Sequence, residues 1–194
     1  MDFNNLMNRL FTSLFLIFFL LILISYFEIY IPYVIILIYL MIFYEIFFFF
    51  KNKKSRSFVL FLYVLISLIS IEIYIIYFFE KVLFLYFIIL ISCFDIFSYI
   101  FGTLFGKKKI LPKISPNKTI FGVFAGLFFT FIVSLIYNNF FYIFTFSTLI
   151  LFSTLIILFA FIGDVIESIY KRRFEIKNSS NILPGHGGIF DRLD

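Results

Sequence analysis

Long apolar segments alternate with short polar or charged segments along the whole chain. A helix that crosses the hydrocarbon core of a bilayer needs about 20 predominantly apolar residues, and each apolar segment comes close to that length. Backbone polar groups find no water in lipid, so each such segment must be helical. The pattern therefore predicts six transmembrane helices, at approximately Leu10–Phe27, Tyr33–Phe50, Phe58–Phe79, Val82–Phe101, Ile120–Tyr137 and Phe141–Ile162.

The composition excludes a soluble globular protein. Of the 194 residues, 63% are hydrophobic, whereas globular domains are about 45–50% apolar, and the mean hydropathy is +1.12. The single cysteine, Cys93, lies inside an apolar segment, which excludes a disulfide framework. No small-residue cleavage site follows the first apolar segment, so we interpret it as a retained helix. The predicted fold class is all-α, a polytopic membrane protein, with residues 1–194 forming a single integral membrane domain.

The positive charges fall on alternate connecting segments and thereby predict the orientation. Of the 16 Lys and Arg residues, only Lys81 lies in a loop of the opposite set. Cytoplasmic loops carry an excess of Lys and Arg, so both termini and both basic loops are predicted to be cytoplasmic. The same cations also suit simple attraction to anionic lipid headgroups. The basic segments contain Arg9, then Lys51, Lys53, Lys54 and Arg56, then Lys107, Lys108, Lys109, Lys113 and Lys118, and finally Lys171, Arg172, Arg173, Lys177 and Arg192.

The segment from Asp95 to Thr119 carries more than charge. Asp95 stands in apolar surroundings near the cytoplasmic end of the fourth predicted span, where a carboxylate usually faces a protein interior or a water-filled cavity. Further on, Ser115, Lys118 and Thr119 place two hydroxyls and an ammonium next to a proline, just before the fifth span. Such groups at the start of a helix suit a phosphate ligand. A phosphate site and a plain solvated loop are both consistent with this segment.

Carboxylates recur where the sixth span reaches water. Asp164 and Ser168 are four residues apart and share one face of a helix, and Asp191 follows in the tail. Carboxylates among many lysines and arginines suit Mg²⁺ with phosphate ligands, since Mg²⁺ typically takes one or two carboxylates. Exposed helix-end charges are the alternative. His186, the single histidine, stands between glycines, where it orders a loop or donates a hydrogen bond to phosphate.

The tail closely resembles the signature of the phosphatidate cytidylyltransferase family, also called CDP-diacylglycerol synthases. The middle segment is similar to the same family, and the resemblance covers about Asp95 to the end of the chain. In the tail the matching residues are Ser168, Lys171, Arg172, Lys177, Pro184, His186, Gly187, Gly188, Asp191, Arg192 and Asp194. In the middle segment they are Asp95, Tyr99, Gly102, Gly106, Ser115, Pro116, Lys118, Thr119 and Gly122, and Glu45 stands near a membrane edge as it often does in the family.

The resemblance implies an enzyme that joins phosphatidate to CTP, releases pyrophosphate and makes CDP-diacylglycerol in a polar cavity on the cytoplasmic side. It implies spans in residues 1–94 and a catalytic half in residues 95–194. Its expected partners are CTP, phosphatidate and membrane lipids, with no nucleic acid, and a homodimer is left open. The implied metal is Mg²⁺, held by Asp164 and Asp191, with a second, monovalent cation left open. The expected catalytic residues are Asp164, Asp191, Lys171 and Arg172, and the expected substrate-binding residues are Ser115, Lys118, Thr119, Ser168, Lys177, His186 and Arg192.

Two other functions remain open from the sequence. Asn178 stands where the family has an aspartate, Phe121 stands where it usually has Glu or Gln, and the family continues past its signature with another span. These departures are consistent with a truncated or degenerate relative that does not catalyse. A membrane transporter or scaffold is less well supported, because the acids within the spans are few and lie mostly near the edges.

Overall fold

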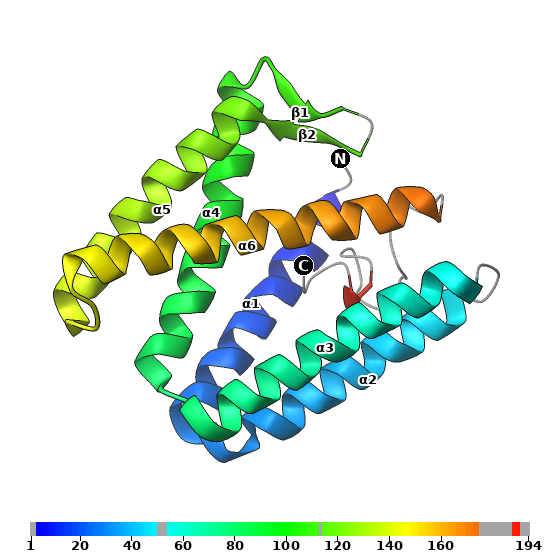
Figure 1. Cartoon of the computed structure of the whole chain (residues 1–194), viewed down its shortest axis with the longest axis horizontal. Helices are drawn as coiled ribbons and strands as arrows, with labels where there is room; N and C mark the ends of the chain where they lie inside the picture. The colour runs from blue at the N-terminus through cyan, green and yellow to red at the C-terminus, as the bar shows by residue number, and fades with distance from the viewer. Residues whose placement is uncertain (1–2, 50–53, 113, 175–187, 191–194) are drawn as a thin grey trace. The chain divides into compact units, whose positions relative to one another are not determined.

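The computed structural model describes residues 3–49, 54–112, 114–174 and 188–190, without the side chains of 3–13, 48–49, 54–57 and 117. Helices form almost all of this part, and one small β-hairpin interrupts them (Figure 1). Within the described residues, five helices are long and apolar enough to cross a membrane, which confirms a polytopic all-α membrane protein. The chain forms two compact units, Met1–Phe79 with Tyr170–Asp194 and Glu80–Ile169, which we call unit 1 and unit 2.

Unit 1 is built on the pair α2 and α3, which lie side by side (Figure 1). Ile42 and Ile46 of α2 pack against Leu60 and Val64 of α3, and Phe190 from the tail joins the same buried cluster. One face of each helix is therefore buried, while its other face carries exposed apolar side chains that suit lipid. The elements are α1 (Phe3–Tyr26), the short 3-10 helix η1 (Glu28–Tyr30), α2 (Ile31–Phe49) and α3 (Lys54–Phe78).

Unit 2 is built on a close crossing of α4 and α5, with the β-hairpin at one end. Gly122 and Gly126 of α5 are buried against α4. A Cβ added at Gly122 would lie 2.5 Å from the backbone oxygen of Ser98, so only glycine permits this approach. Small residues are the usual means by which membrane helices pack closely. The elements are α4 (Lys81–Phe105), β1 (Lys109–Leu111), β2 (Ser115–Thr119), α5 (Ile120–Phe141) and α6 (Phe146–Arg173), whose last turn from Tyr170 belongs to unit 1.

Hydroxyl groups join α6 to the other two helices of unit 2. Tyr86 of α4, Ser134 of α5 and Ser153 of α6 hydrogen-bond to one another at 2.8, 2.9 and 3.1 Å. All three side chains are fully buried. Because an unpaired hydroxyl in hydrocarbon is costly, this cluster favours one arrangement of the three helices.

The helices differ from the predicted spans mainly at their ends. The fifth helix runs to Phe141, and Tyr142 ends it in the left-handed conformation (φ 52°), so the sixth helix begins at Phe146 and not at Phe141. The sixth helix also continues eleven residues past the predicted end at Ile162, to Arg173. Of α1, the side chains are described for Leu14–Tyr26, an apolar stretch shorter than a span, so a membrane crossing by α1 stays a prediction.

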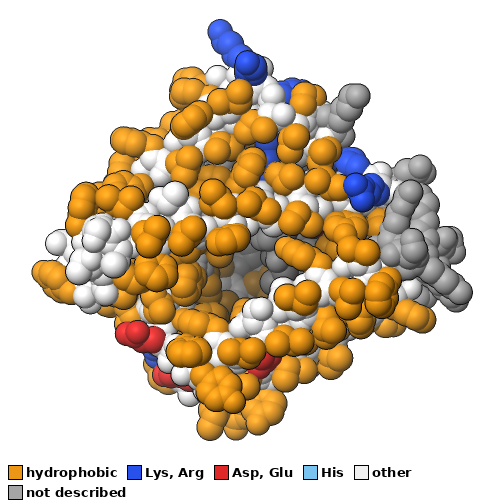
Figure 2. Space-filling view, in the orientation of Figure 1, with side chains coloured by type: hydrophobic (Ala, Val, Ile, Leu, Met, Phe, Trp, Pro, Cys, Tyr) orange, Lys and Arg blue, Asp and Glu red, His pale blue; other side chains and the backbone are white. Residues whose placement is uncertain are grey.

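The exposed surface is mostly hydrophobic, as lipid-facing helices require. Figure 2 shows apolar side chains over most of the visible described face, with most of the visible Lys and Arg side chains at the β-hairpin and at the end of α6. The hairpin itself was missed from the sequence, which predicts only a loop between Gly102 and Thr119. Its strands are antiparallel, and Lys109 lies opposite Thr119.

Candidate active site

The β-hairpin positions its last residues at the start of α5. The backbone N–H of Ile120 donates to the carbonyl oxygen of Lys108 at 3.0 Å, which fastens the end of β2 to the beginning of β1. Thr119 caps α5, because its hydroxyl oxygen accepts a hydrogen bond of 3.1 Å from the N–H of Gly122. Lys118 therefore directly precedes the helix cap and projects from the end of β2 that these hydrogen bonds hold.

Lys118 and Asp164 form an ion pair between β2 and α6. The side chain of Lys118 is 18% exposed and that of Asp164 is 27% exposed, so neither is sealed from solvent. The ammonium also lies 4.7 Å from the centre of the Phe161 ring, one turn before Asp164 on the same helix. A cation is attracted to the face of an aromatic ring. Phe161 thus holds the lysine side chain next to the carboxylate.

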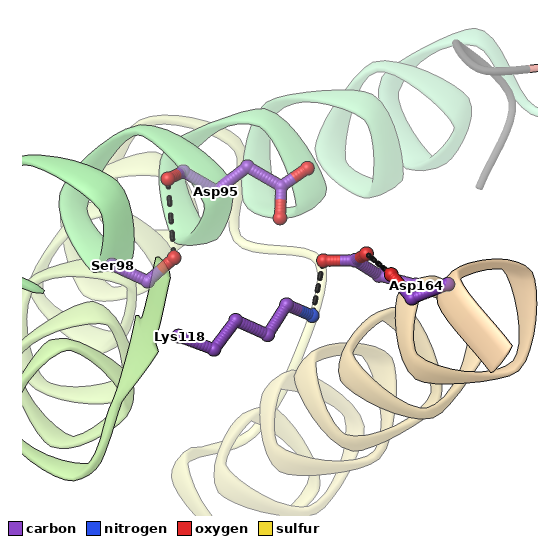
Figure 3. Close-up of polar contacts among 5 residues, drawn as sticks. Asp95, Ser98, Lys118 and Asp164 are labelled. Atoms are coloured by element: carbon purple, nitrogen blue, oxygen red, sulfur yellow. Dashed lines mark hydrogen bonds and ion pairs between the residues drawn. The ribbon is translucent and has the colours of Figure 1, made fainter. Parts of the chain in front are cut away.

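Asp95 brings a second carboxylate to this place from α4. Figure 3 shows the Asp95 and Asp164 carboxylates directed toward the same space, with the Lys118 ammonium at Asp164. Ser98, one turn after Asp95, donates its hydroxyl to the Asp95 carbonyl oxygen at 3.1 Å. These side chains line a pocket of about 250 Å³ together with Phe94, Tyr99, Ser115, Thr119, Val123 and Phe161.

The pocket combines the groups that an anionic ligand with a hard cation would need. Lys118 supplies an ammonium, Ser98 and Ser115 supply hydroxyls, and the two aspartates supply hard oxygen atoms. Oxygen donors suit Mg²⁺, which usually takes one or two carboxylates and leaves its other positions to water and phosphate. The described residues contain no group of three or more His, Cys, Asp or Glu side chains that could bind a metal without such help. The donor set therefore fits Mg²⁺ that is shared with a phosphate ligand.

The structure brings together five of the site residues predicted from the sequence. Ser115, Lys118, Thr119 and Asp164 line the pocket, although the Thr119 hydroxyl is buried and occupied in capping α5. Ser168 lies on the same face of α6 as Asp164 and donates to its carboxylate in a long hydrogen bond of 3.4 Å. The prediction that Asp164 and Ser168 share one face of a helix is therefore confirmed. The functional roles of all five residues stay predictions.

The other predicted site residues lie elsewhere along the tail. Lys171 and Arg172 belong to the last, basic turn of α6, seven and eight residues after Asp164. Lys177, His186, Asp191 and Arg192 lie outside the described residues. The proposed Asp164–Asp191 metal site thus stays a prediction.

Six of the ten residues that line the pocket were not predicted as site residues, although Asp95 and Tyr99 were matched to the family signature. Ser98 lies three residues after Asp95, a helical spacing that could have indicated it. Phe161 lies among many similar phenylalanines of an apolar helix, so no sequence signal distinguishes it.

Comparison with known proteins agrees with the family resemblance found in the sequence. Residues 56–194 match the cytidylyltransferase family. A phosphatidate cytidylyltransferase of Staphylococcus epidermidis is 39% identical over 151 residues, which cover 74% of this chain and 57% of that protein. Phosphatidate cytidylyltransferases of Staphylococcus aureus and Staphylococcus haemolyticus are 46% and 49% identical, over 57% and 52% of this chain and 43% and 39% of theirs. The aligned part of the chain therefore covers 57% of the first of these curated relatives and less than half of the other two.

Proposed function

Because this chain belongs to the cytidylyltransferase family, we propose that it is a phosphatidate cytidylyltransferase, which makes CDP-diacylglycerol and pyrophosphate from CTP and phosphatidate. The observation that carries the proposal is the Lys118–Asp164 pair in a polar pocket of an otherwise apolar membrane protein. Membership of the family also removes the unrelated transporter or scaffold from the alternatives. The remaining alternative is a relative that does not catalyse.

The reaction needs positioning and charge stabilisation more than a strong base. A phosphate oxygen of phosphatidate attacks the α-phosphorus of CTP and forms the new P–O bond. The bond from the α-phosphorus to the oxygen that leads to the β-phosphate breaks, and pyrophosphate leaves with its electron pair. The attacking phosphate is already ionised near neutral pH. Catalysis of this kind rests on alignment of the reacting groups and on positive charge near the phosphate oxygens.

The pocket residues have separate roles in this proposal. Lys118 donates to phosphate oxygens, and the ring of Phe161 keeps its ammonium at the pocket when substrate is absent. Ser115 offers a hydroxyl donor to the same oxygens, and the Ser98 hydroxyl could do so only by giving up its hydrogen bond to the Asp95 carbonyl oxygen. Lys171 and Arg172, in the last turn of α6, and Lys177 and Arg192 of the tail add positive charge for the released or bound phosphates.

Mg²⁺ is the proposed cofactor, with Asp164 and Asp191 as its protein ligands. When bound, it supplies positive charge that offsets the charge of the triphosphate. A binding role for Asp164 agrees with its partial exposure and with the ion pair to a lysine, whose ammonium a bound cation would displace. A second, monovalent cation and a homodimer stay predictions.

In the proposed orientation, the pocket faces the cytoplasm. The β-hairpin that borders the pocket carries exposed Lys107, Lys108 and Lys109, and the positive-inside rule assigns such segments to the cytoplasmic side. Cytoplasmic CTP and the phosphatidate headgroup would then meet at one membrane surface. The same cations attract anionic lipids, with about 1 kcal/mol for each.

An assay on the full chain tests the function directly. The purified protein, reconstituted with phosphatidate and supplied with Mg²⁺ and labelled CTP, is expected to form labelled CDP-diacylglycerol and release pyrophosphate in equal amounts. Omission of phosphatidate should abolish both products. Folded protein that forms neither product under these conditions would overturn the proposal in favour of a non-catalytic relative.

A further inference from the structure

Glu45 is a fully buried carboxylate that the proposed chemistry does not use. It lies on α2, inside an apolar stretch of the candidate span Glu28–Phe47, and its exposed fraction is 0%. A carboxylate within a membrane span is costly unless it is paired or faces a protein interior. The partners of Glu45 therefore indicate what its presence achieves.

The Glu45 carboxylate accepts two hydrogen bonds from consecutive backbone N–H groups of the tail. The N–H of Ile189 donates to Oε1 at 2.9 Å, and the N–H of Phe190 donates to Oε2 at 3.0 Å. Hydrogen bonds to a charged acceptor are about twice as strong as bonds between neutral groups. Each carboxylate oxygen thus fixes one peptide unit of the segment that follows Gly188.

The Phe190 side chain holds the same turn from its other side. It is 7% exposed and packs with Ile42, Ile46, Leu60 and Val64 between α2 and α3. Its backbone is thereby fixed by a carboxylate while its ring is fixed by an apolar cluster. Two contacts of different kinds on one residue leave little freedom for the adjoining peptide.

We propose that Glu45 is a positioning residue for the tail signature, and that its carboxylate fixes the backbone immediately before Asp191 and Arg192. Adjacent Cα atoms are about 3.8 Å apart, so fixing Phe190 limits the places that Asp191 can reach. This inference rests on the proposed function, in which Asp191 binds Mg²⁺ and Arg192 binds phosphate. Groups that orient a metal ligand typically alter metal affinity or activity by about 10- to 100-fold when they are replaced.

The Glu45→Gln substitution tests the inference because it keeps the size of the side chain. A glutamine oxygen can accept one of the two N–H groups, but its NH₂ group then faces the second donor. Hydrogen exchange of the Ile189 and Phe190 amides, measured by mass spectrometry on the full chain in detergent, is expected to quicken by about 10-fold or more. Glu80→Gln is the matched control, because Glu80 is exposed and its side chain makes no capping bond.

The Mg²⁺ dependence separates positioning from simple stabilisation. We expect the Mg²⁺ concentration for half-maximal CDP-diacylglycerol formation to rise about 10-fold in Glu45→Gln and to stay unchanged in Glu80→Gln. A merely structural role would lower the amount of folded protein and leave this concentration unchanged. If Glu45→Gln does not fold, Glu45→Asp, which keeps both oxygens but shortens their reach, is expected to show the same two changes to a smaller extent.

The outcomes distinguish this inference from the proposed function. Unchanged amide exchange in the Glu45 variants would show that the Glu45 carboxylate does not hold the backbone at Ile189 and Phe190. Faster exchange with an unchanged Mg²⁺ dependence would overturn the positioning role. If the unsubstituted chain forms no CDP-diacylglycerol, the proposed function fails. The exchange measurement would still decide whether Glu45 holds the turn.

Discussion

Unit 1 and unit 2 each contain a carboxylate with well-defined partners, Glu45 in unit 1 and Asp164 in unit 2, and the two sets of partners differ in kind. Glu45 is fully buried and receives two backbone N–H groups. Asp164 is 27% exposed and faces the ammonium of Lys118, at the end of a side chain that can rotate. Fixed backbone donors cannot exchange for a ligand, whereas a lysine ammonium can move from a carboxylate to a phosphate. The difference supports the two proposals made above, that Glu45 positions the tail and that Asp164 takes part in binding.

The largest expected difference between the two carboxylates is in activity, and Asp164→Asn tests it. The substitution keeps the size of the side chain and removes its charge, so we expect the rate of CDP-diacylglycerol formation to fall by about 100-fold or more. The free energy of unfolding should change by less than about 1 kcal/mol, because partly exposed ion pairs contribute little to stability. The measurements are the labelled-CTP assay and equilibrium unfolding in mixed detergent micelles.

The control for this prediction is Glu80→Gln, the same chemical change at an exposed position of unit 2. It should leave both the rate and the unfolding free energy close to those of the unsubstituted chain. An Asp164→Asn variant that retains its rate would show that Asp164 is no closer to the chemistry than Glu45 is.

The helices of both units could be predicted from the sequence, because lipid leaves an apolar segment of sufficient length no alternative to a helix. Their ends were less predictable. The sixth helix extends to Arg173 because the helical backbone continues through the charged segment, whereas hydropathy marks only the apolar part. The β-hairpin was missed because its short strands, Lys109–Leu111 and Ser115–Thr119, lack alternating apolar and polar residues and include Pro116.

The candidate site was predictable in some of its members and not in its contacts. The tail and middle segments supplied Asp164, Lys118 and Ser115 through their chemistry, and charge patterning assigned them to one side of the membrane. The Lys118–Asp164 pair depends on the packing of unit 2, to which the buried hydroxyls of Tyr86 and Ser153 contribute. Glu45 itself was matched to the family, but its partners had no sequence signal, because they are backbone N–H groups that every residue except proline carries.

The contrast between Asp164 and Glu45 assumes that the Lys118 ammonium can move from Asp164 to a phosphate. Lys118→Met tests this assumption. Methionine keeps an apolar side chain of similar length against Phe161 but cannot donate to phosphate. We expect the KM of one substrate to rise about 10- to 100-fold, as for loss of a hydrogen bond to a charged group. A change confined to the KM for CTP would assign Lys118 to the nucleotide, and a change confined to the KM for phosphatidate would assign it to the lipid.

Two further lysine variants complete this test. Lys118→Arg should recover part of the loss, because it restores the charge with a different geometry. Lys109→Met removes an exposed lysine from the other strand of the same hairpin, so it should shift either KM by no more than about 2-fold, as screened surface charges contribute little. Equal effects of Lys118→Met and Lys109→Met would mean that Lys118 contributes only to the general positive charge of the hairpin.

The contrast between Asp164 and Glu45 also assumes that the wall of the pocket is rigid. Gly122→Ala tests this rigidity and has the smallest expected effect. Gly122 lies where α5 meets α4, and a Cβ there would come within 2.5 Å of the Ser98 backbone oxygen and 2.9 Å of the Gly102 Cα. Backbone atoms cannot rotate away, so Gly122→Ala must push the two helices apart, at a cost of about 1–3 kcal/mol in unfolding free energy. Ser98 and the capping residue Thr119 line the pocket, so the catalytic rate should also fall a few-fold. Gly126→Ala is the matched control, because its Cβ would lie 3.0 Å from the Cδ2 of Phe94 and the Cβ of Ser98, so a shift of a few tenths of an ångström would relieve the contact. Equal losses of stability in the two variants, measured by unfolding in mixed micelles, would show that the crossing of α4 and α5 is no tighter at the pocket than one turn away from it. A pocket wall that yields so easily could not hold Lys118 opposite Asp164, and the contrast with Glu45 would then reflect looseness of unit 2 and not a binding role.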